Sequence, residues 1–351
     1  MKPYPNRLTR FVLLLSIVVW LMACKPNPQD DIALFQSFIT ENINKKSADP
    51  YISSTVKPGD KMYDILVNIQ HGKHDIASNK LQSLIEGNDS DAMVWYAKLI
   101  YRASVNNRPK ALSLYKKAMD DGNPYAYIML SPGLISSGCV SYFGEKNCTL
   151  EHFNKAIELF KPLAAQGDLR AQYFLLQQQE LEKSKETRAQ YIQEVIRFSK
   201  NHYYQPLMDY VNTILTRPQG KDKYEARTTE QYNLAIDLLT IASNNNYIPA
   251  IKRLLEVDLD EEIFTKRMEQ LTRLGSTFEI YENYFNSQDE HERYYYSMLF
   301  KQLTGDNKLS SSYRATDDKV KMINEKIEKV ISSMTPMVYI DGFTSRDDWV
   351  D

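Results

Sequence analysis

Few side chains in this 351-residue sequence have the types and the spacing that a reaction requires. His71 and His74 are close enough along the chain to seat a metal ion, but two histidines beside a glycine in a polar segment are usually surface residues. The acidic residues of segment 258–262 match a helix start or a solvated helix face. No nucleophile elbow, phosphate loop, dinucleotide-binding glycine pattern or zinc-protease helix is present. We therefore expect no catalytic residue, no cofactor and no metal, and a protein that is not an enzyme.

Two of the three cysteines, Cys139 and Cys148, lie near each other in a polar segment that contains turn-forming residues. In an oxidising compartment such a pair favours a disulfide over a metal site, because two cysteines alone make a poor ligand set. A loop this short contributes about 2–3 kcal/mol to stability when it is unstrained. We predict a Cys139–Cys148 disulfide.

The first residues of the chain have the layout of a secretory signal peptide. A polar, basic stretch at 1–10 is followed by an apolar run at 11–22 and by the small residue Ala23, directly before Cys24. The apolar run is shorter than the roughly 20 residues that a membrane-spanning helix needs, so a permanent transmembrane anchor is the weaker alternative.

The four residues Leu21-Met22-Ala23-Cys24 resemble the bacterial lipobox. The resemblance implies cleavage before Cys24 and several lipid chains on that cysteine, which together give a stable anchor. The alternative is an ordinary signal peptide with a chance cysteine, which leaves an unpaired thiol. By resemblance to the sorting rule of such lipoproteins, Lys25 in place of Asp implies the outer membrane, facing the periplasm.

Composition limits the remaining possibilities. The formal net charge of −2 gives no basic footprint for nucleic acid. With 12 Gly and 14 Pro, the chain is too poor in turn residues for a β-rich or low-complexity body. The residues after position 23 are numerous enough for two or three domains or for one elongated repeat array.

Internal repeats favour the array. Residues 110–130 align without gaps with residues 155–175, and a third copy follows in residues 234–254. In each copy the apolar residues recur with helical spacing, and a residue that tolerates a left-handed conformation ends the first helix. That slot holds Gly122, Gly167 and Asn246 in the clear copies, and Asn88, Tyr203 and Gly275 in three weaker ones.

The repeat pattern is Lys-Ala-x-x-Leu-aromatic-Lys-x-Ala/Leu-x-x-x-Gly-x-x-x-Ala, and it is clearest from Lys110 and Lys155. It resembles the Sel1-like branch of tetratricopeptide-type helical repeats over residues 60–285. The resemblance implies an all-α fold, a helical-repeat solenoid of stacked antiparallel helix pairs. Several copies lack the Leu-Gly of that family in the second helix, which leaves individual repeat boundaries open.

We divide the chain into five parts. They are a lipoprotein signal peptide at 1–23, a lipidated tether at 24–34, the Sel1-like solenoid at 35–285, C-terminal helices at 286–335 and an acidic-aromatic tail at 336–351. In the fourth part we expect helices over 290–303 and 318–334. In the tail, residues 337–340 favour an extended conformation and Asp341-Gly342 a turn.

Aromatic side chains are the best candidates for contact with a partner, because rigid amphipathic rings are typical of interface hot spots. The candidates are Trp95, Tyr204, Tyr294 and Tyr295. The alternative is that they fill the core of the repeats, since consecutive tyrosines on a helix face different directions.

The tail offers a second candidate. Asp347, Asp348 and Trp349 together could act as an acidic-aromatic plug for a basic cleft on a partner. The alternative is a frayed chain end.

Helical solenoids present concave surfaces to other proteins, so we expect a lipid-anchored, periplasm-facing protein that binds a protein partner. A more specific resemblance is to Sel1-like lipoproteins that act as immunity proteins against phospholipase effectors of type VI secretion. It implies capture of a secreted phospholipase and occlusion of its active site. The alternative is an envelope adaptor that scaffolds or regulates a cell-wall or outer-membrane assembly machine, and a hidden C-terminal enzyme is the least favoured class.

Overall fold

The computed structural model describes residues 26–132, 138–218, 224–257, 260–314 and 316–350. Cys24 and the predicted signal peptide lie outside the described residues. Within them the fold is all-α, and the only β pairing is an isolated bridge between Thr216 and Glu225. None of the described helices combines the length and the apolar character needed to cross a membrane.

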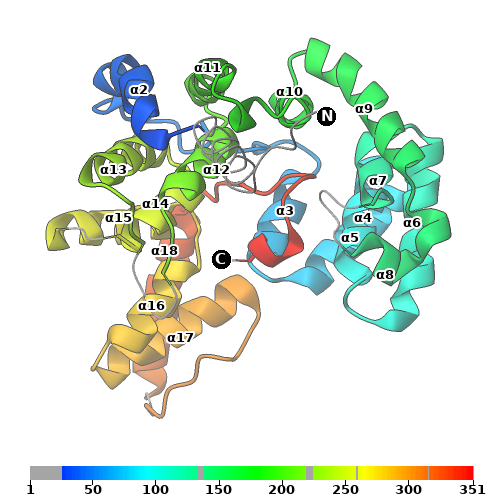
Figure 1. Cartoon of the computed structure of the whole chain (residues 1–351). Helices are drawn as coiled ribbons and strands as arrows, with labels where there is room; N and C mark the ends of the chain where they lie inside the picture. Colours follow the sequence, from blue (N-terminus) through cyan, green and yellow to red (C-terminus); the bar gives the residue numbers. More distant parts are fainter. Residues whose placement is uncertain (1–25, 133–137, 219–223, 258–259, 315, 351) are drawn as a thin grey trace, which may run out of the picture.

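Six helix pairs form the repeat array, as the sequence predicts (Figure 1). They are α4 (His74–Glu86) with α5 (Ser90–Ile100), α6 (Arg108–Asp120) with α7 (Pro124–Met129), α9 (Leu150–Ala165) with α10 (Leu169–Gln177), α11 (Arg188–Lys200) with α12 (Gln205–Ile214), α13 (Thr229–Asn244) with α14 (Ile248–Leu255), and α15 (Glu261–Arg273) with α16 (Phe278–Asn286). Neighbouring pairs pack through α5 and α6, α7 and α9, α12 and α13, and α14 and α15. Between α10 and α11 the rings of Tyr173 and Phe198 lie 5.6 Å apart, so the array continues as a solenoid.

The turn inside each pair depends on one residue in the left-handed region. Gly122, Gly167, Gly275, Asn88 and Asn246 have the positive φ that the repeat pattern predicts. In the α11–α12 pair the alignment was wrong by one residue: His202, not Tyr203, adopts a φ of 59°. The second helix of this pair also begins one residue later relative to the turn, so the copy contains a one-residue insertion that the alignment missed.

Side-chain caps fix the starts of the second helices. The carboxylate of Asp168 accepts hydrogen bonds from the amides of Arg170 and Ala171 at the start of α10, and Asp89 accepts one from Ala92 in α5. Asn123 caps α7, in which Pro124 occupies the first turn. The local sequence therefore sets both the end of one helix and the beginning of the next.

The N-terminal helix α2 (Pro28–Asn42) corrects the predicted tether. We expected residues 24–34 to link lipid and body, but Pro28 lies in the first turn of α2, where its missing N–H is not needed. The helix packs against α11 and α13, far along the chain. Its Asp31 is fully buried and pairs with Arg188 at 2.6 Å, while the Tyr210 hydroxyl donates to the same carboxylate at 3.0 Å. The folded body therefore begins at Pro28.

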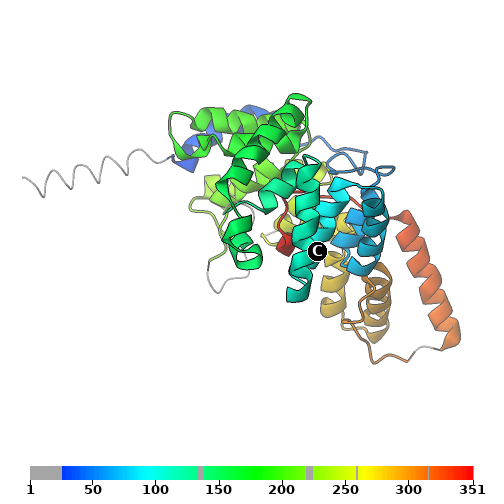
Figure 2. The same cartoon turned by 90° about the vertical axis from the view of Figure 1, so that its right-hand side faces the viewer.

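The remaining helices complete the array. They are α3 (Tyr63–Gln70), α8 (Cys139–Phe143), α17 (Glu290–Thr304) and α18 (Asp317–Ser333), the last two close to the predicted bounds. Helix α18 runs along the outside of the body (Figure 2) and packs against α17. Short 3-10 turns cover Val105–Asn107, Glu145–Asn147, Leu181–Lys183 and Arg346–Asp348.

Candidate functional site

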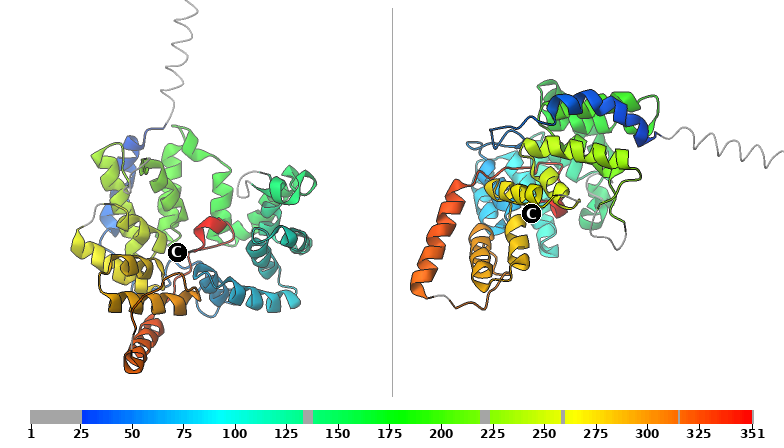
Figure 3. Two further views of the ribbon diagram at one scale, coloured as in Figure 1. Left: turned by 90° about the horizontal axis from the view of Figure 1, so that it is seen from below. Right: turned by 90° about the vertical axis from the view of Figure 1, so that its left-hand side faces the viewer.

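The helices surround a centre that the C-terminal segment, residues 336–350, crosses (Figures 1 and 3). Residues 334–341 belong to no helix or strand, and polar groups of α3 and of the loop before it bind the C-terminal segment. The Thr55 amide donates to the Val338 carbonyl at 2.8 Å. The Gln70 side-chain amide donates to Met337 O and accepts from Tyr339 N, both at 3.0 Å. The segment thus lies in the solenoid as a bound peptide lies in a groove.

Three apolar side chains anchor the C-terminal segment in three different parts of the core. Met337 is buried in the cluster formed by α2 and α10–α15, and Trp349 is buried in the cluster formed by α3–α8. Phe343 stacks on Phe174 with ring centroids 5.3 Å apart and lies 5.3 Å from Phe160. The segment therefore joins parts of the array that are distant along the chain.

Lys98 holds the last turn of this segment. It is 3% exposed, and its ammonium donates to the carbonyls of Gly342 at 2.9 Å and Thr344 at 3.1 Å. The same ammonium lies 4.9 Å from the ring of Trp95 and 5.2 Å from that of Trp349, distances at which the two indoles stabilise a cation. Burial lowers the pKa of Lys98 to about 8, an effect that the nearby Asp341 partly opposes.

Most of the side chains predicted to contact a partner are interior. Trp95, Tyr204, Tyr295 and Trp349 are at most 9% exposed, and Trp349 packs on Trp95 with ring centroids 5.3 Å apart. The interpretation of the tail as a plug for another protein is therefore corrected, because its tryptophan fills this chain's own core.

The other predicted contact residues keep exposed surface. Tyr294 is half-buried, and Asp347 and Asp348 are exposed. Asp347 accepts a hydrogen bond from Arg102 at 2.8 Å. In the acidic-aromatic tail, therefore, Asp347 and Asp348 face solvent and the indole of Trp349 does not.

A cavity of about 680 Å³, which we call the chamber, lies between the C-terminal segment and helices α10, α12, α14 and α16. Its volume is within the range of small-molecule and side-chain pockets. Eight aromatic side chains line it: Tyr173, Phe174, Tyr203, Tyr224, Tyr247, Phe278, Tyr339 and Phe343. Asp347, Asp348 and Val350 belong to the lining and are exposed, so the chamber reaches solvent beside the C-terminal segment.

One end of the chamber combines carboxylates with tyrosine hydroxyls. The Tyr173 hydroxyl donates to Asp209 at 2.5 Å, and the Gln205 side-chain amide donates to the other oxygen of Asp209 at 2.9 Å. Tyr247 donates to Gln205 Oε1 at 3.3 Å, and Tyr203 donates to Asp341 Oδ2 at 3.3 Å. The hydroxyl protons are thus committed, and the oxygen lone pairs of the chamber remain as acceptors.

The electrostatics of this end are those of a buried acidic site. Burial raises the pKa of Asp209, the hydrogen bonds from Tyr173 and Gln205 oppose the rise, and the negative charge of Asp341 adds to it. Burial also raises the pKa of Tyr173, Tyr203 and Tyr247. Among the described residues, no Lys, Arg or His forms an ion pair with Asp209 or Asp341.

The sequence did not point to this chamber, whose polar end draws on α10, α12, α14 and the tail. The one signal was the pair Tyr203-Tyr204, of which we favoured Tyr204 as a contact residue and placed Tyr203 in the turn slot of its repeat. The shifted turn at His202 reverses the two, because Tyr203 lines the chamber and Tyr204 is 1% exposed in the core.

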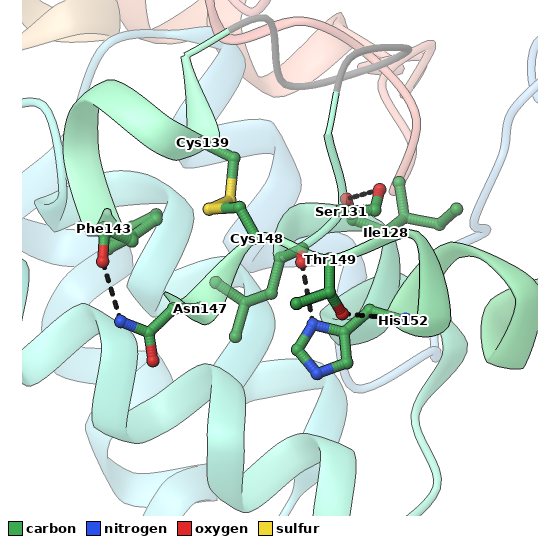
Figure 4. Close-up of a disulfide and its surroundings, with 9 residues drawn as sticks. Ile128, Ser131, Cys139, Phe143, Asn147, Cys148, Thr149 and His152 are labelled. Carbon is green, nitrogen blue, oxygen red and sulfur yellow. Dashed lines mark hydrogen bonds between the residues drawn. A yellow bond between two sulfur atoms is a disulfide. The ribbon is translucent and has the colours of Figure 1, made fainter. Parts of the chain in front are cut away.

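The Cys139–Cys148 disulfide is present, with the two Cα atoms 6.0 Å apart (Figure 4). It joins α8 to the segment just before α9, where Thr149 caps the new helix through the His152 amide. Both cysteines are buried, and the neighbouring Phe143 packs on Tyr115 with ring centroids 5.8 Å apart. The disulfide therefore closes the insertion between the α6–α7 and α9–α10 pairs.

The two histidines weighed for metal binding and the acidic residues of 258–262 are placed as follows. His71 is buried with its Nε2 2.7 Å from the Gly275 carbonyl, and His74 lies in the first turn of α4 with a pKa lowered by burial. Asp260 caps α15, whereas residues 258 and 259 lie outside the described part of the chain. Within that part, no three His, Cys, Asp or Glu side chains are grouped as metal ligands.

Comparison with models of known protein families found no match, and comparisons with curated proteins and with solved structures found none either. A functional proposal for this chain therefore rests on its sequence, its fold and its chamber.

Proposed function

We propose that this chain is a lipid-anchored protein of the bacterial envelope that binds a protein partner. The observation that carries the proposal is the chamber, an open cavity on the inner side of a helical-repeat array, which is the side such arrays use for binding. The predicted signal peptide and the lipobox-like residues before Cys24 support the envelope location.

The C-terminal segment limits which part of the array can bind. Because it occupies the centre of the solenoid, a partner has access to the chamber and its rim and not to a whole concave face. Asp347 and Asp348 belong to that rim, so the acidic part of the tail keeps the binding role predicted from the sequence while the aromatic part does not.

As the specific role we propose immunity against a phospholipase effector of type VI secretion, as the Sel1-like pattern of the repeats suggests. The partner's active-site mouth would be covered by the rigid rim of the chamber, which loses little conformational entropy on binding because the helices and the C-terminal segment hold it in place. The lipid on Cys24 would keep the protein next to the bilayer under attack.

The test is co-expression with the product of a neighbouring gene directed to the periplasm. We expect the wild-type chain to restore growth and to co-purify with the effector. A chain with Asp348→Arg on the rim should protect less, whereas Lys319→Glu on the outer helix α18 should protect as the wild type does. Absence of both protection and binding contradicts the immunity role, and a cell-wall synthase gene in the neighbourhood instead favours the envelope adaptor.

A further inference from the structure

The acidic end of the chamber holds no ion pair. The negative charge of Asp341 raises the pKa of Asp209, and it also raises the pKa of Lys98 and of Arg170. In the described part of the chain, however, no Lys, Arg or His forms an ion pair with Asp209 or Asp341. Two carboxylates in a partly dehydrated cavity repel each other, and this costs free energy unless a positive charge joins them.

The two cationic side chains of the lining are engaged with other groups. Arg253 pairs with Glu256 at 3.3 Å, donates to Asn212 at 2.7 Å and lies 4.0 Å from the ring centre of Tyr224. Lys252 lies 5.2 Å from the ring centre of Phe278. Neither of these two cations forms an ion pair with Asp209 or Asp341.

The hydrogen-bonding pattern of the acidic end leaves acceptors rather than donors. Tyr173, Tyr203 and Tyr247 use their hydroxyl protons within the protein, so their free lone pairs and those of the carboxylates can only accept. Aromatic rings next to carboxylates are also the surroundings in which proteins bind ammonium and guanidinium groups. The volume of the chamber is also sufficient, since it accommodates an ammonium or guanidinium group together with several attached atoms.

We propose that the chamber binds an organic cation, an ammonium or guanidinium group, between Tyr173, Tyr203 and Tyr247 with Asp209 and Asp341 as its counter-ions. The cation is carried either by a free small molecule or by a lysine or arginine side chain of a protein partner. The proposal goes beyond the proposed function and does not depend on it. The site recognises the positive charge of the ammonium or guanidinium group, whichever molecule bears that group.

The experiment is calorimetric titration of the mature chain in detergent with three probes. Agmatine represents a free cation, the peptide acetyl-Gly-Arg-Gly-amide represents a partner side chain, and acetyl-Gly-Glu-Gly-amide is the acidic control. We expect one or both cationic probes to bind at millimolar concentration or below, and the acidic peptide not to bind. Tighter binding of the arginine peptide assigns the site to a protein partner, and tighter binding of agmatine assigns it to a free cation.

Conservative variants locate the site. Asp209→Asn and Asp341→Asn keep the side-chain shape and an acceptor oxygen, so we expect them to fold and to weaken binding roughly tenfold or more through loss of charge. Tyr247→Phe should have a smaller effect. The matched control is Asp237→Asn, a half-buried carboxylate of α13 outside the chamber, which should leave binding unchanged.

Three results would each overturn the proposal. The first is that neither cationic probe binds at a probe concentration 10-fold above about 1 mM. The second is that both chamber variants bind the probes as the wild type does, although circular dichroism shows the variants folded. The third is that the acidic peptide binds as tightly as the cationic probes. A loss of phospholipase immunity alone does not bear on it, so failure of the proposed function and failure of the cation site are distinguishable.

Discussion

Replacing Trp349 with alanine tests whether the C-terminal segment is part of the core. Trp349 is fully buried, packs on Trp95 at 5.3 Å and donates from Nε1 to Thr344 O at 3.3 Å. A buried tryptophan removes about 150–250 Å² of surface from water, which at about 25 cal/mol per Å² is about 4–6 kcal/mol. Truncations of this kind cost about 3–5 kcal/mol in practice, and we expect that loss for Trp349→Ala.

The assay is urea unfolding of the mature chain followed by far-ultraviolet circular dichroism. Two of the three tryptophans, Trp95 and Trp349, remain after removal of the predicted signal peptide. Because they touch, the near-ultraviolet spectrum of the chains that keep Trp349 reports on whether the segment is docked. Val350→Ala is the matched control, since Val350 is 44% exposed and its truncation should change stability by less than about 0.5 kcal/mol. If Trp349→Ala costs less than about 1 kcal/mol, or no more than the control, the segment is not a core element.

Three further predictions concern charges and the disulfide. Burial lowers the pKa of Lys98 from 10.5 to about 8, so on raising the pH the folded state loses this proton before the unfolded state does. The difference in unfolding free energy between the wild type and Lys98→Met should therefore rise in favour of the wild type by on the order of 3 kcal/mol between pH 8 and 10.5. A pH-independent difference between the two chains would contradict the burial of a charged ammonium. Asp31→Ala leaves Arg188 without its buried partner and should cost about 3–5 kcal/mol in urea unfolding, whereas Glu41→Ala on the exposed face of α2 should cost little. Reduction of Cys139–Cys148 should lower stability by about 2–3 kcal/mol, and a Cys139→Ser, Cys148→Ser chain should not respond to reductant.

The helix pairs were predictable because their signals are local. Apolar spacing sets each helix, and Gly122, Gly167 or Asn246 supplies the left-handed residue within a few positions of its end. The same locality explains the error at Tyr203. Histidine is a less usual residue for a positive φ than glycine or asparagine, so His202 gave no signal against the alignment.

The C-terminal segment and the chamber were not predictable because their contacts join distant parts of the chain. Trp349 has acidic neighbours in sequence, and nothing local indicates that it packs on Trp95. Asp209 reads as one polar residue on an amphipathic helix, and it approaches Asp341 only because the segment returns through the array. Burial of Lys98 follows from the same return, since its acceptors are carbonyls of the segment.

The docking of Trp349 on Trp95 has a consequence for the time course of synthesis. Translation adds Trp349 more than 250 residues after Trp95, which at about 5–20 residues per second is a delay of roughly 10–50 s. During that interval the cluster of α3–α8 is made but lacks the indole of Trp349, and Lys98 lacks its two carbonyl acceptors. The part of the cluster that Trp349 covers therefore stays open for tens of seconds, until the end of the chain is made.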